Sequence, residues 1–396
     1  MITTIPPQYV RRTLVRLQSR GYQAYLVGGC VRDMLMGVQP HDWDICTSAL
    51  PHEVMEIFPT ARPTGLKHGT VTVYINSRSL EVTTFRSESS YADHRHPDSV
   101  SFVGDLHTDL SRRDFTMNAI ALPVDGLIRD PFGGVQDIKN GIVRCVGEPE
   151  RRFEEDALRM FRALRFAARL GFEIEEKTMS AIERKAPLAE TLAAERVREE
   201  TEKIILTNSP HMVYELVCLG LLDAYIIKRS PDARIFDALG HTVKKPLERW
   251  ALLSMIMAEQ GMIGSVEDFL SSLRLDSRSI RIAANCRRIM RNPLPQTAYQ
   301  WKKLLNAYDV PTVSCAVRCH DALSGEKRIK ELKAVLKSGD CFSVKHLAIG
   351  GDELLELGLR GRELGEMLTF LLDYVMEYPE NNRREILLNL AAGSEE

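Results

Sequence analysis

Two aspartates separated by one residue, Asp42 and Asp44, are well suited to binding a metal ion. The segment that begins near His41 predicts a β-strand, and residues i and i+2 of a strand point to the same face. Both carboxylates would therefore project together, where like charges repel each other. A divalent cation relieves that repulsion, and hard oxygen ligands of this kind suit Mg²⁺. Because a lone pair of aspartates is more often a solvated strand end or a turn, a second feature has to support the assignment.

A glycine pair, Gly28-Gly29, lies just upstream of these aspartates. The apolar residues 25–27 predict a buried strand before the pair, and residues 30–36 predict a short helix after it. Backbone N–H groups and the helix dipole favour phosphate at such a helix N-terminus. Arg32, one turn into the helix, adds a cation at the same place. Together, the phosphate-binding turn, the cation and the paired aspartates predict a site for a nucleoside triphosphate and its metal.

The stretch that carries these residues resembles the first motif of the tRNA nucleotidyltransferases, or CCA-adding enzymes, of the bacterial and eukaryotic class. That motif reads LVGGxVRDxLLG followed by DxDI, and this sequence has LVGGCVRDMLMG and DWDI. The family belongs to the polymerase-β-like nucleotidyltransferase superfamily, together with the bacterial poly(A) polymerases. The resemblance is specific over residues 22–206 and looser from there to the C-terminus.

A second motif of that family, RRDFTxNA, is matched at residues 112–119. From the residues alone, this segment predicts a charged helix start ahead of an apolar helical stretch that ends near residue 120. The resemblance implies that Arg113 contacts the incoming nucleotide. It also implies that Asp114 and Asn118 hold the ribose side of the pocket.

The family's nucleotide-selecting motif, EDxxR, begins at Glu155 within a segment, residues 153–170, whose apolar spacing predicts one helix. Charged side chains recur along it every three residues: Asp156, Arg159, Arg162 and Arg165. As a bare pattern, they favour a solvated helix face held by local Asp–Arg pairs. The resemblance implies instead that Asp156 and Arg159 address the Watson–Crick edge of the base, since Asp accepts and Arg donates hydrogen bonds. It also implies that the two later arginines line the ATP/CTP site.

Residues 70–75 and 80–85 alternate apolar and polar side chains, which predicts a β-hairpin joined at residues 76–79. Glu81, on the second arm, is a candidate third carboxylate of the metal site. A solvated strand face explains this glutamate nearly as well, so both interpretations stay open.

Two connecting segments complete the predicted catalytic part. Residues 86–97 are polar and lack periodicity, which predicts a mobile loop. Residues 129–146 predict a closing hairpin with a glycine pair in its turn.

The composition bounds the class of protein. The 396 residues are 44% hydrophobic and 27% charged, which is ordinary for a soluble protein of several domains. The net charge of −2 gives no sign of a long nucleic-acid track, although a basic groove can be offset by acidic surface elsewhere. No run approaches a membrane span, and no signal peptide is predicted. The eight cysteines are scattered singly, which predicts free thiols in a reducing cytoplasm.

We therefore expect an α+β fold with a small mixed-sheet head followed by helices. The expected parts are a nucleotidyltransferase head (1–145), a helical neck with the nucleotide-selecting helix (146–208), a helical body (209–300) and a helical, tRNA-binding tail (301–396). The expected function is template-independent addition of CCA to the 3′ end of tRNA from CTP and ATP. The resemblance implies two Mg²⁺ ions held by Asp42 and Asp44, phosphates cradled by Gly28, Gly29 and Arg32, and no membrane partner.

Three alternatives stay open. A poly(A) polymerase shares the head motifs but typically carries a basic C-terminal extension, whereas this sequence ends in Ala-Gly-Ser-Glu-Glu. An enzyme that adds only the final A keeps the loop at 86–97, so the sequence does not exclude it. An inactive RNA-binding scaffold is argued against by the intact aspartates and arginines. The sequence gives no indication of the oligomeric state.

Overall fold

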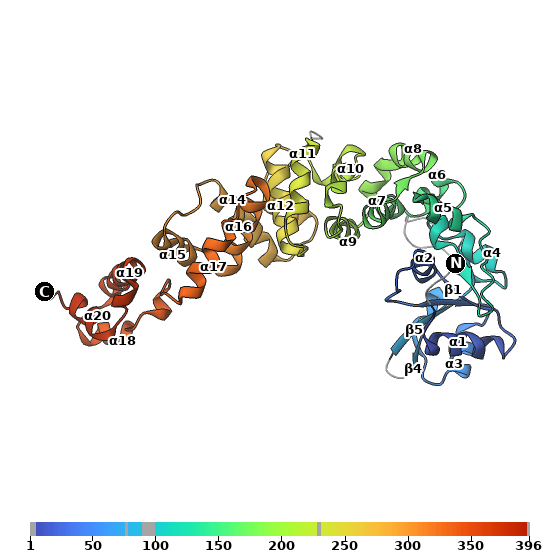
Figure 1. Cartoon of the computed structure of the whole chain (residues 1–396), viewed down its shortest axis with the longest axis horizontal. Helices are drawn as coiled ribbons and strands as arrows, with labels where there is room; N and C mark the ends of the chain where they lie inside the picture. Colours follow the sequence, from blue (N-terminus) through green and yellow to red (C-terminus); the bar gives the residue numbers. More distant parts are fainter. Residues whose placement is uncertain (1–4, 76–77, 89–99, 228–230, 394–396) are drawn as a thin grey trace. The chain divides into compact units, whose positions relative to one another are not determined.

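The computed structural model describes residues 5–75, 78–88, 100–227 and 231–393. The chain divides into two compact units, Met1–Arg229 (unit 1) and Ser230–Glu396 (unit 2). Unit 1 contains strands and helices, and the described part of unit 2 is helical (Figure 1). The α-helices of unit 1 are α1 (Gln8–Gln18), α2 (Gly29–Leu35), α3 (Pro51–Ile57), α4 (Leu106–Ser111), α5 (Gly134–Asn140), α6 (Pro149–Glu155), α7 (Leu158–Leu170), α8 (Glu176–Lys185), α9 (Ala194–Ile205) and α10 (Val213–Cys218). Its 3-10 turns are η1 (Leu66–His68), η2 (Thr116–Asn118), η3 (Ala186–Thr191), η4 (Pro210–Met212) and η5 (Asp223–Tyr225).

A mixed sheet lies at the centre of the head in unit 1. Its strands are β1 (Ala24–Val27), β2 (Asp44–Thr47), β3 (Arg62–Gly65), β4 (Thr70–Ile75), β5 (Arg78–Thr84) and β8 (Ala121–Leu122). Their order in space is β3-β4-β5-β2-β1-β8, and β2 runs parallel to β5 whereas the other neighbours are antiparallel. Two short pairs lie outside this sheet: β6 (Arg86–Glu88) with β7 (Val100–Phe102), and β9 (Ile142–Val143) with β10 (Glu173–Ile174). The predicted α+β class with a small mixed-sheet head is confirmed.

Alternate residues of the two central strands enter two separate cores, because successive side chains of a strand point to opposite faces. Leu26 and Ile45 pack on one face with residues of α1, α2 and α3. Val27 and Cys46 pack on the other face with Leu110 of α4. Asp44 is two residues before Cys46, so its side chain projects toward the face that α4 covers.

The strand that carries Asp44 begins later than the sequence predicts. β2 starts at Asp44 itself, and Asp42 lies in the preceding bend. The pairing of β2 with β1 runs only as far as Leu26 and Ile45, because β1 gives way to the turn at Gly28. The two aspartates are therefore adjacent along the chain without sharing a regular strand face.

The hairpin predicted for residues 129–146 is wrong, because helix α5 forms there. The carboxylate of Asp130 accepts hydrogen bonds from the backbone N–H groups of Gly134 (2.8 Å) and Val135 (2.9 Å) and so caps the helix. A Cβ atom on Gly134 would lie 2.1 Å from the carbonyl oxygen of Thr116. The glycine pair thus marks a helix start and a close backbone approach.

The single helix predicted for residues 153–170 is interrupted. α6 ends at Glu155 and α7 begins at Leu158, with Asp156 in extended backbone between them (φ −147°, ψ 102°). The Oδ1 atom of Asp156 accepts a hydrogen bond from the backbone N–H of Leu158 at 3.2 Å. Asp156 therefore satisfies a backbone donor at the start of α7, which a residue in mid-helix cannot do.

The helical stretch expected up to residue 120 is reduced to the 3-10 turn η2. The backbone of this segment bonds to a distant part of the chain instead: the N–H of Thr116 donates to the carbonyl of Arg144, and the N–H of Val146 donates to the carbonyl of Asp114. Long-range backbone pairing of this kind leaves no local sequence signal.

The hairpin predicted from residues 70–75 and 80–85 is confirmed as β4 and β5. Residues 76 and 77 of its turn lie outside the described residues. The predicted loop at 86–97 begins instead with strand β6, and its remaining residues, 89–97, also lie outside the described ranges.

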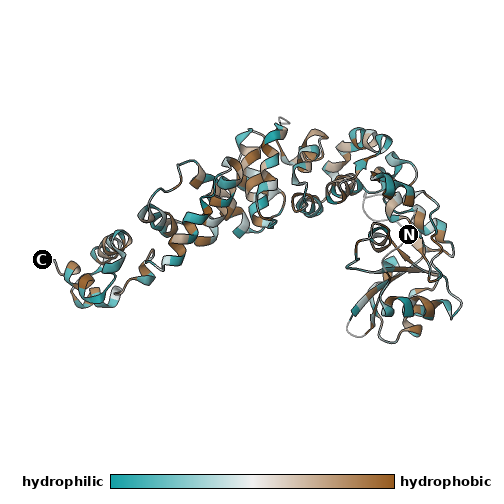
Figure 2. Cartoon of the chain, in the orientation of Figure 1, coloured by the Kyte–Doolittle hydropathy of each residue, from teal (hydrophilic) through white to brown (hydrophobic). Residues whose placement is uncertain are grey.

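Unit 2 is built from helices that carry both hydrophilic and hydrophobic residues (Figure 2). They are α11 (Ala233–Phe236), α12 (Pro246–Glu259), α13 (Val266–Ser272), α14 (Ser277–Met290), α15 (Ala298–Ala307), α16 (Val310–Ser324), α17 (Ile329–Ser338), α18 (Gly351–Glu356), α19 (Gly361–Glu377) and α20 (Arg384–Ala391), with 3-10 turns η6 (Asp237–His241), η7 (Val344–His346) and η8 (Pro379–Asn381). α12 is buried along most of its length. Within the described ranges, every helix is too short or too polar to cross a bilayer.

Candidate active site

The turn after β1 brings the backbone of Gly28 close to the side chains of Arg113 and Asp44. Gly28 has a positive φ of 77°, a conformation that glycine adopts without strain, and it precedes the first turn of α2. A Cβ atom on Gly28 would lie 3.2 Å from Nη1 of Arg113 and 3.7 Å from Oδ2 of Asp44. These two side chains from distant parts of the chain thus converge on the glycine turn, as the nucleotide-site prediction requires.

Glu81 lies next to Asp44, on the neighbouring parallel strand. The two residues are paired in register between β2 and β5, so their side chains point to the same face of the sheet. Burial raises the pKa of Asp44, and the charges of Glu81 and Asp42 raise it further, while Arg113 opposes the shift. Negative charge is therefore concentrated at this edge of β2.

These carboxylates suit a cation whose remaining coordination positions are filled by a bound ligand. In the described ranges, no three His, Cys, Asp or Glu side chains are close enough to hold a metal ion by themselves. Mg²⁺ commonly takes one or two carboxylates and fills its other positions with phosphate oxygens and water. Asp42 and Asp44, beside the glycine turn that is predicted to bind phosphate, match that donor set.

A buried carboxylate that the sequence analysis missed holds the arginines of the second motif. Asp109, on α4, is fully buried and accepts hydrogen bonds from Nε of Arg112 (3.0 Å) and Nη2 of Arg113 (3.4 Å). A buried carboxylate that bonds two cations fixes their orientation. The i+3 and i+4 spacing of the three residues was an available signal, but it suggests an ordinary surface pair as readily as a buried one.

A chain of hydrogen bonds links Arg32 on α2 to α7. Nη1 of Arg32 donates to Oδ1 of Asn118 at 2.8 Å, and Nδ2 of Asn118 donates to Oδ1 of Asp114 at 3.1 Å. Oδ2 of Asp114 accepts from Nε of Arg162 at 2.9 Å. Arg32 and Arg162 thus belong to one connected network, although they are far apart in the sequence.

The side chains of Asp156 and Arg159 bond to different elements of unit 1. Oδ2 of Asp156 lies 3.2 Å from Nη2 of Arg196 on α9. Arg159 is only 7% exposed, and it donates to Glu155 (2.8 Å) and to the carbonyl of Arg112 (3.2 Å). The interpretation as a solvated face held by local Asp–Arg pairs is therefore wrong for these two residues.

Helix α9 supports α7 and the residues just before it through two ion pairs. Besides the contact of Arg196 with Asp156, Oε2 of Glu200 lies 2.6 Å from Nε of Arg165. Glu200 is 4% exposed, so this pair is shielded from water. Arg196 and Glu200 of α9 therefore contact the charged side chains of residues 156 and 165 directly.

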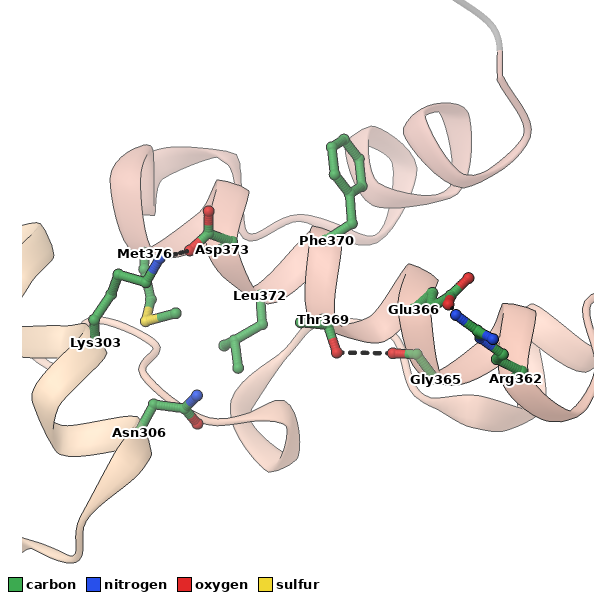
Figure 3. A pocket seen from close by; sticks show the side chains of 10 residues that line it. All are labelled: Lys303, Asn306, Arg362, Gly365, Glu366, Thr369, Phe370, Leu372, Asp373 and Met376. Atoms are coloured by element: carbon green, nitrogen blue, oxygen red, sulfur yellow. Dashed lines mark hydrogen bonds and ion pairs between the residues drawn. The ribbon is translucent and has the colours of Figure 1, made fainter.

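Unit 2 contains a cavity of about 640 Å³ between α15 and α19 (Figure 3). Phe370 lies on its rim and is 52% exposed. The cations that line the cavity already have partners: Lys303 lies 2.9 Å from Asp373, and Arg362 lies 2.7 Å from Glu366. The cavity therefore offers an aromatic surface with paired charges around it.

Two family models match the chain. The Poly A polymerase head domain matches residues 24–144. The probable RNA and SrmB-binding site of polymerase A matches residues 171–228.

The chain is also similar to curated proteins over nearly its whole length. It is 35% identical to the CCA-adding enzyme of Enterococcus faecalis over 402 residues, which cover 98% of this chain and 97% of that protein. It is 37% identical to the CCA-adding enzyme of a Geobacillus species, with 93% of this chain and 92% of that protein covered. Among solved structures, the Bacillus stearothermophilus CCA-adding enzyme in complex with CTP aligns with a TM-score of 0.83 at 33% identity, over 98% of each chain.

Proposed function

This chain belongs to the family of the CCA-adding enzymes, and from that membership we propose that it adds CCA to the 3′ end of tRNA without a template, using CTP and ATP. The observation that carries the proposal is the convergence of Gly28, Asp44 and Arg113 at one point of the head. That point combines a phosphate-binding turn, a carboxylate and a cation, which are the parts that nucleotidyl transfer needs. Similarity over the full length of CCA-adding enzymes favours this activity over that of a poly(A) polymerase.

In this proposal, Asp42 and Asp44 would hold Mg²⁺, which would act as a Lewis acid and neutralise part of the charge of the triphosphate. The backbone at Gly28 and Gly29, together with Arg32, binds the phosphates. Arg113, held by its buried carboxylate partner, orients the nucleotide. The 3′-hydroxyl oxygen of the RNA then forms a bond to the α-phosphorus and gives up its proton to water. The bond from the α-phosphorus to the bridging oxygen breaks, and pyrophosphate leaves.

We propose that Asp156 and Arg159 select the base through hydrogen bonds to its Watson–Crick edge. Both side chains are already bonded to protein groups, so a nucleotide has to share or replace those partners. Arg162 and Arg165 complete the same pocket from α7. When the Watson–Crick edge of the correct base satisfies the buried donors and acceptors of the site, the edge of another base is rejected. Some of those donors or acceptors would then be left unpaired.

We further propose that the tail contacts the RNA through the cavity of Figure 3. An exposed aromatic ring offers a stacking surface for a base, and Phe370 is such a ring. Phe370→Ala should raise KM for tRNA and leave KM for CTP unchanged. Leu357→Ala is the matched control, since Leu357 is an exposed apolar residue of the same unit that does not line the cavity. An equal effect of both variants on tRNA would contradict this part of the proposal.

The main experiment uses three tRNA substrates, lacking CCA, CA or only the final A. Each is incubated with the purified protein, CTP, ATP and Mg²⁺, and the 3′ ends are sequenced. We expect complete CCA ends on all three. Extension of only the third substrate would identify an enzyme that adds A alone, and long A tracts would identify a poly(A) polymerase. Loss of activity in EDTA and recovery with added Mg²⁺ would support the proposed cofactor.

A further inference from the structure

The ring of Phe166, on α7, contacts three arginines of the candidate active site. Its centroid lies 4.2 Å from the guanidinium carbon of Arg165, 5.2 Å from that of Arg32 and 5.8 Å from that of Arg162. All three distances are within the range, up to about 6 Å, in which the negative face of an aromatic ring attracts a cation. The ring is 5% exposed and packs edge-on against Phe115. The ring is therefore shielded from water, as are the side chains of Arg32 and Arg165, which are 3% and 12% exposed.

These arginines come from two parts of unit 1. Arg32 projects from α2 at the phosphate turn, whereas Arg162 and Arg165 project from α7. Three cations around one point repel each other, so the arrangement needs compensating groups. Each arginine has its own carboxylate partner; these partners are Asp33, Asp114 and Glu200. The ring of Phe166 is a group that all three share.

The carboxylates and the ring differ in what they leave available to a ligand. A carboxylate occupies N–H donors of the guanidinium group, so a nucleotide must replace it or share its arginine. The ring attracts the cation through its π face and competes far less for those donors. We propose that Phe166 is a positioning residue that keeps Arg32, Arg162 and Arg165 in place while their N–H groups change partners on nucleotide binding.

The inference rests on the proposed function and adds a residue that no motif singled out. A side chain at position 166 that attracts cations less strongly should lower the affinity for CTP and for ATP together, because both nucleotides contact the same three arginines. The value of kcat at saturating nucleotide should change less, because the ring acts through the arginines and not on the reacting atoms.

The decisive variant carries pentafluorophenylalanine at position 166, which nearly keeps the shape of phenylalanine but reverses the charge distribution of its ring. We expect KM for CTP and for ATP to rise roughly tenfold, since several weak attractions are lost together. Phe166→Leu should shift KM in the same direction. Phe161→Leu is the matched control, because Phe161 is a fully buried phenylalanine of the same helix, and the cation–π pairs of the described residues do not include its ring.

Two results would overturn the inference. One is a wild-type KM in the fluorinated variant, whether or not Phe166→Leu folds. The other is an equal rise of KM in Phe161→Leu and Phe166→Leu, which would indicate a general packing defect.

Calorimetric titration with CTP in the presence of Ca²⁺ tests the same affinity change without turnover. A wild-type protein that binds CTP but extends no RNA would therefore count against the proposed function alone.

Discussion

Asp44 on β2 and Glu81 on β5 lie side by side, in register, on two parallel strands. Their side chains share a face of the sheet, and the charge of Glu81 adds to the effect of burial in raising the pKa of Asp44. A cation at this edge would lower the pKa of Asp44 again, because a positive charge favours the ionised carboxylate. The pairing makes Glu81 either a ligand of that cation or a neighbour that strengthens the negative field, and these roles predict different losses of activity.

Replacing the carboxylates separates the two roles of Glu81. Asp42→Ala and Asp44→Ala should each lower kcat/KM for CTP by more than the roughly 10–100-fold that loss of an outer partner of a metal site costs. The loss of kcat/KM caused by Glu81→Gln should stay within that range if Glu81 acts only through its charge. Circular dichroism of each variant checks the fold. Activity within about tenfold of wild type in either aspartate variant would contradict the metal assignment.

Replacing Gly28 tests the glycine turn. Gly28→Ala adds a Cβ atom 3.2 Å from Nη1 of Arg113 and strains a residue with a φ of 77°. We expect KM for CTP to rise at least about tenfold, because the atom displaces the guanidinium group from the phosphate turn. Gly126→Ala is the matched control, since Gly126 has a similar φ of 82° but open space around its Cβ position. Equal effects on KM would indicate backbone strain alone.

The pH dependence of stability tests the pair of Asp114 and Arg162. Burial of Asp114 would raise its pKa, but the charge and hydrogen bonds of Arg162, together with the hydrogen bond from Asn118, outweigh burial and lower it. A lowered pKa in the folded state stabilises the fold above the ordinary aspartate pKa of about 3.9, and this stabilisation is lost as pH falls toward the lowered value.

Asp114→Asn should therefore lower the melting temperature at pH 7, equivalent to about 1.5–3 kcal/mol for a lost charged hydrogen bond. The difference from wild type should stay constant down to about pH 5 and shrink at lower pH. Arg162→Gln serves as the second arm, because it removes the cation that lowers the pKa of Asp114. A difference that does not change between pH 7 and pH 3 would contradict this account.

The parts of the site that depend on local pattern could be predicted from the sequence. The strand, glycine turn and helix around Gly28 follow from apolar periodicity and helix-start chemistry, and the hairpin that carries Glu81 follows from strict alternation. The register that pairs Glu81 with Asp44 could not be predicted from the sequence. A shift of one residue between the two strands would move every side chain to the other face, and the local pattern does not fix that shift.

The errors have a common physical cause, which is a tertiary contact that overrides local preference. The glycines at 133–134 predict a turn, yet Gly134 is required by its close approach to the carbonyl of Thr116. Asp156 lies within a strong helical pattern, yet it caps the start of α7 and pairs with Arg196. Phe166 gave no signal at all, because its apolar position is explained equally well by an ordinary core.

Base selection is tested by Arg159→Ala. Arg159 donates to Glu155 and to the carbonyl of Arg112, so the substitution removes structural contacts as well as the proposed base contact. Arg152 offers a matched control, because it also bonds Glu155 (2.6 Å) and a carbonyl of the same segment, that of Ser111 (3.1 Å). Arg152→Ala should therefore reproduce the structural loss without the loss of selection.

The measured quantity is kcat/KM for all four nucleotides on one tRNA substrate. Each lost hydrogen bond to the base edge is worth roughly 1–3 kcal/mol, so Arg159→Ala should reduce the preference for CTP over UTP by roughly ten- to a hundredfold. Arg152→Ala should lower the melting temperature and the overall rate but keep the wild-type ratio. If UTP and GTP remain as poorly used by Arg159→Ala as by wild type, Arg159 serves only to join α6 and α7 to the head. Base choice would then have to lie with Arg162 and Arg165.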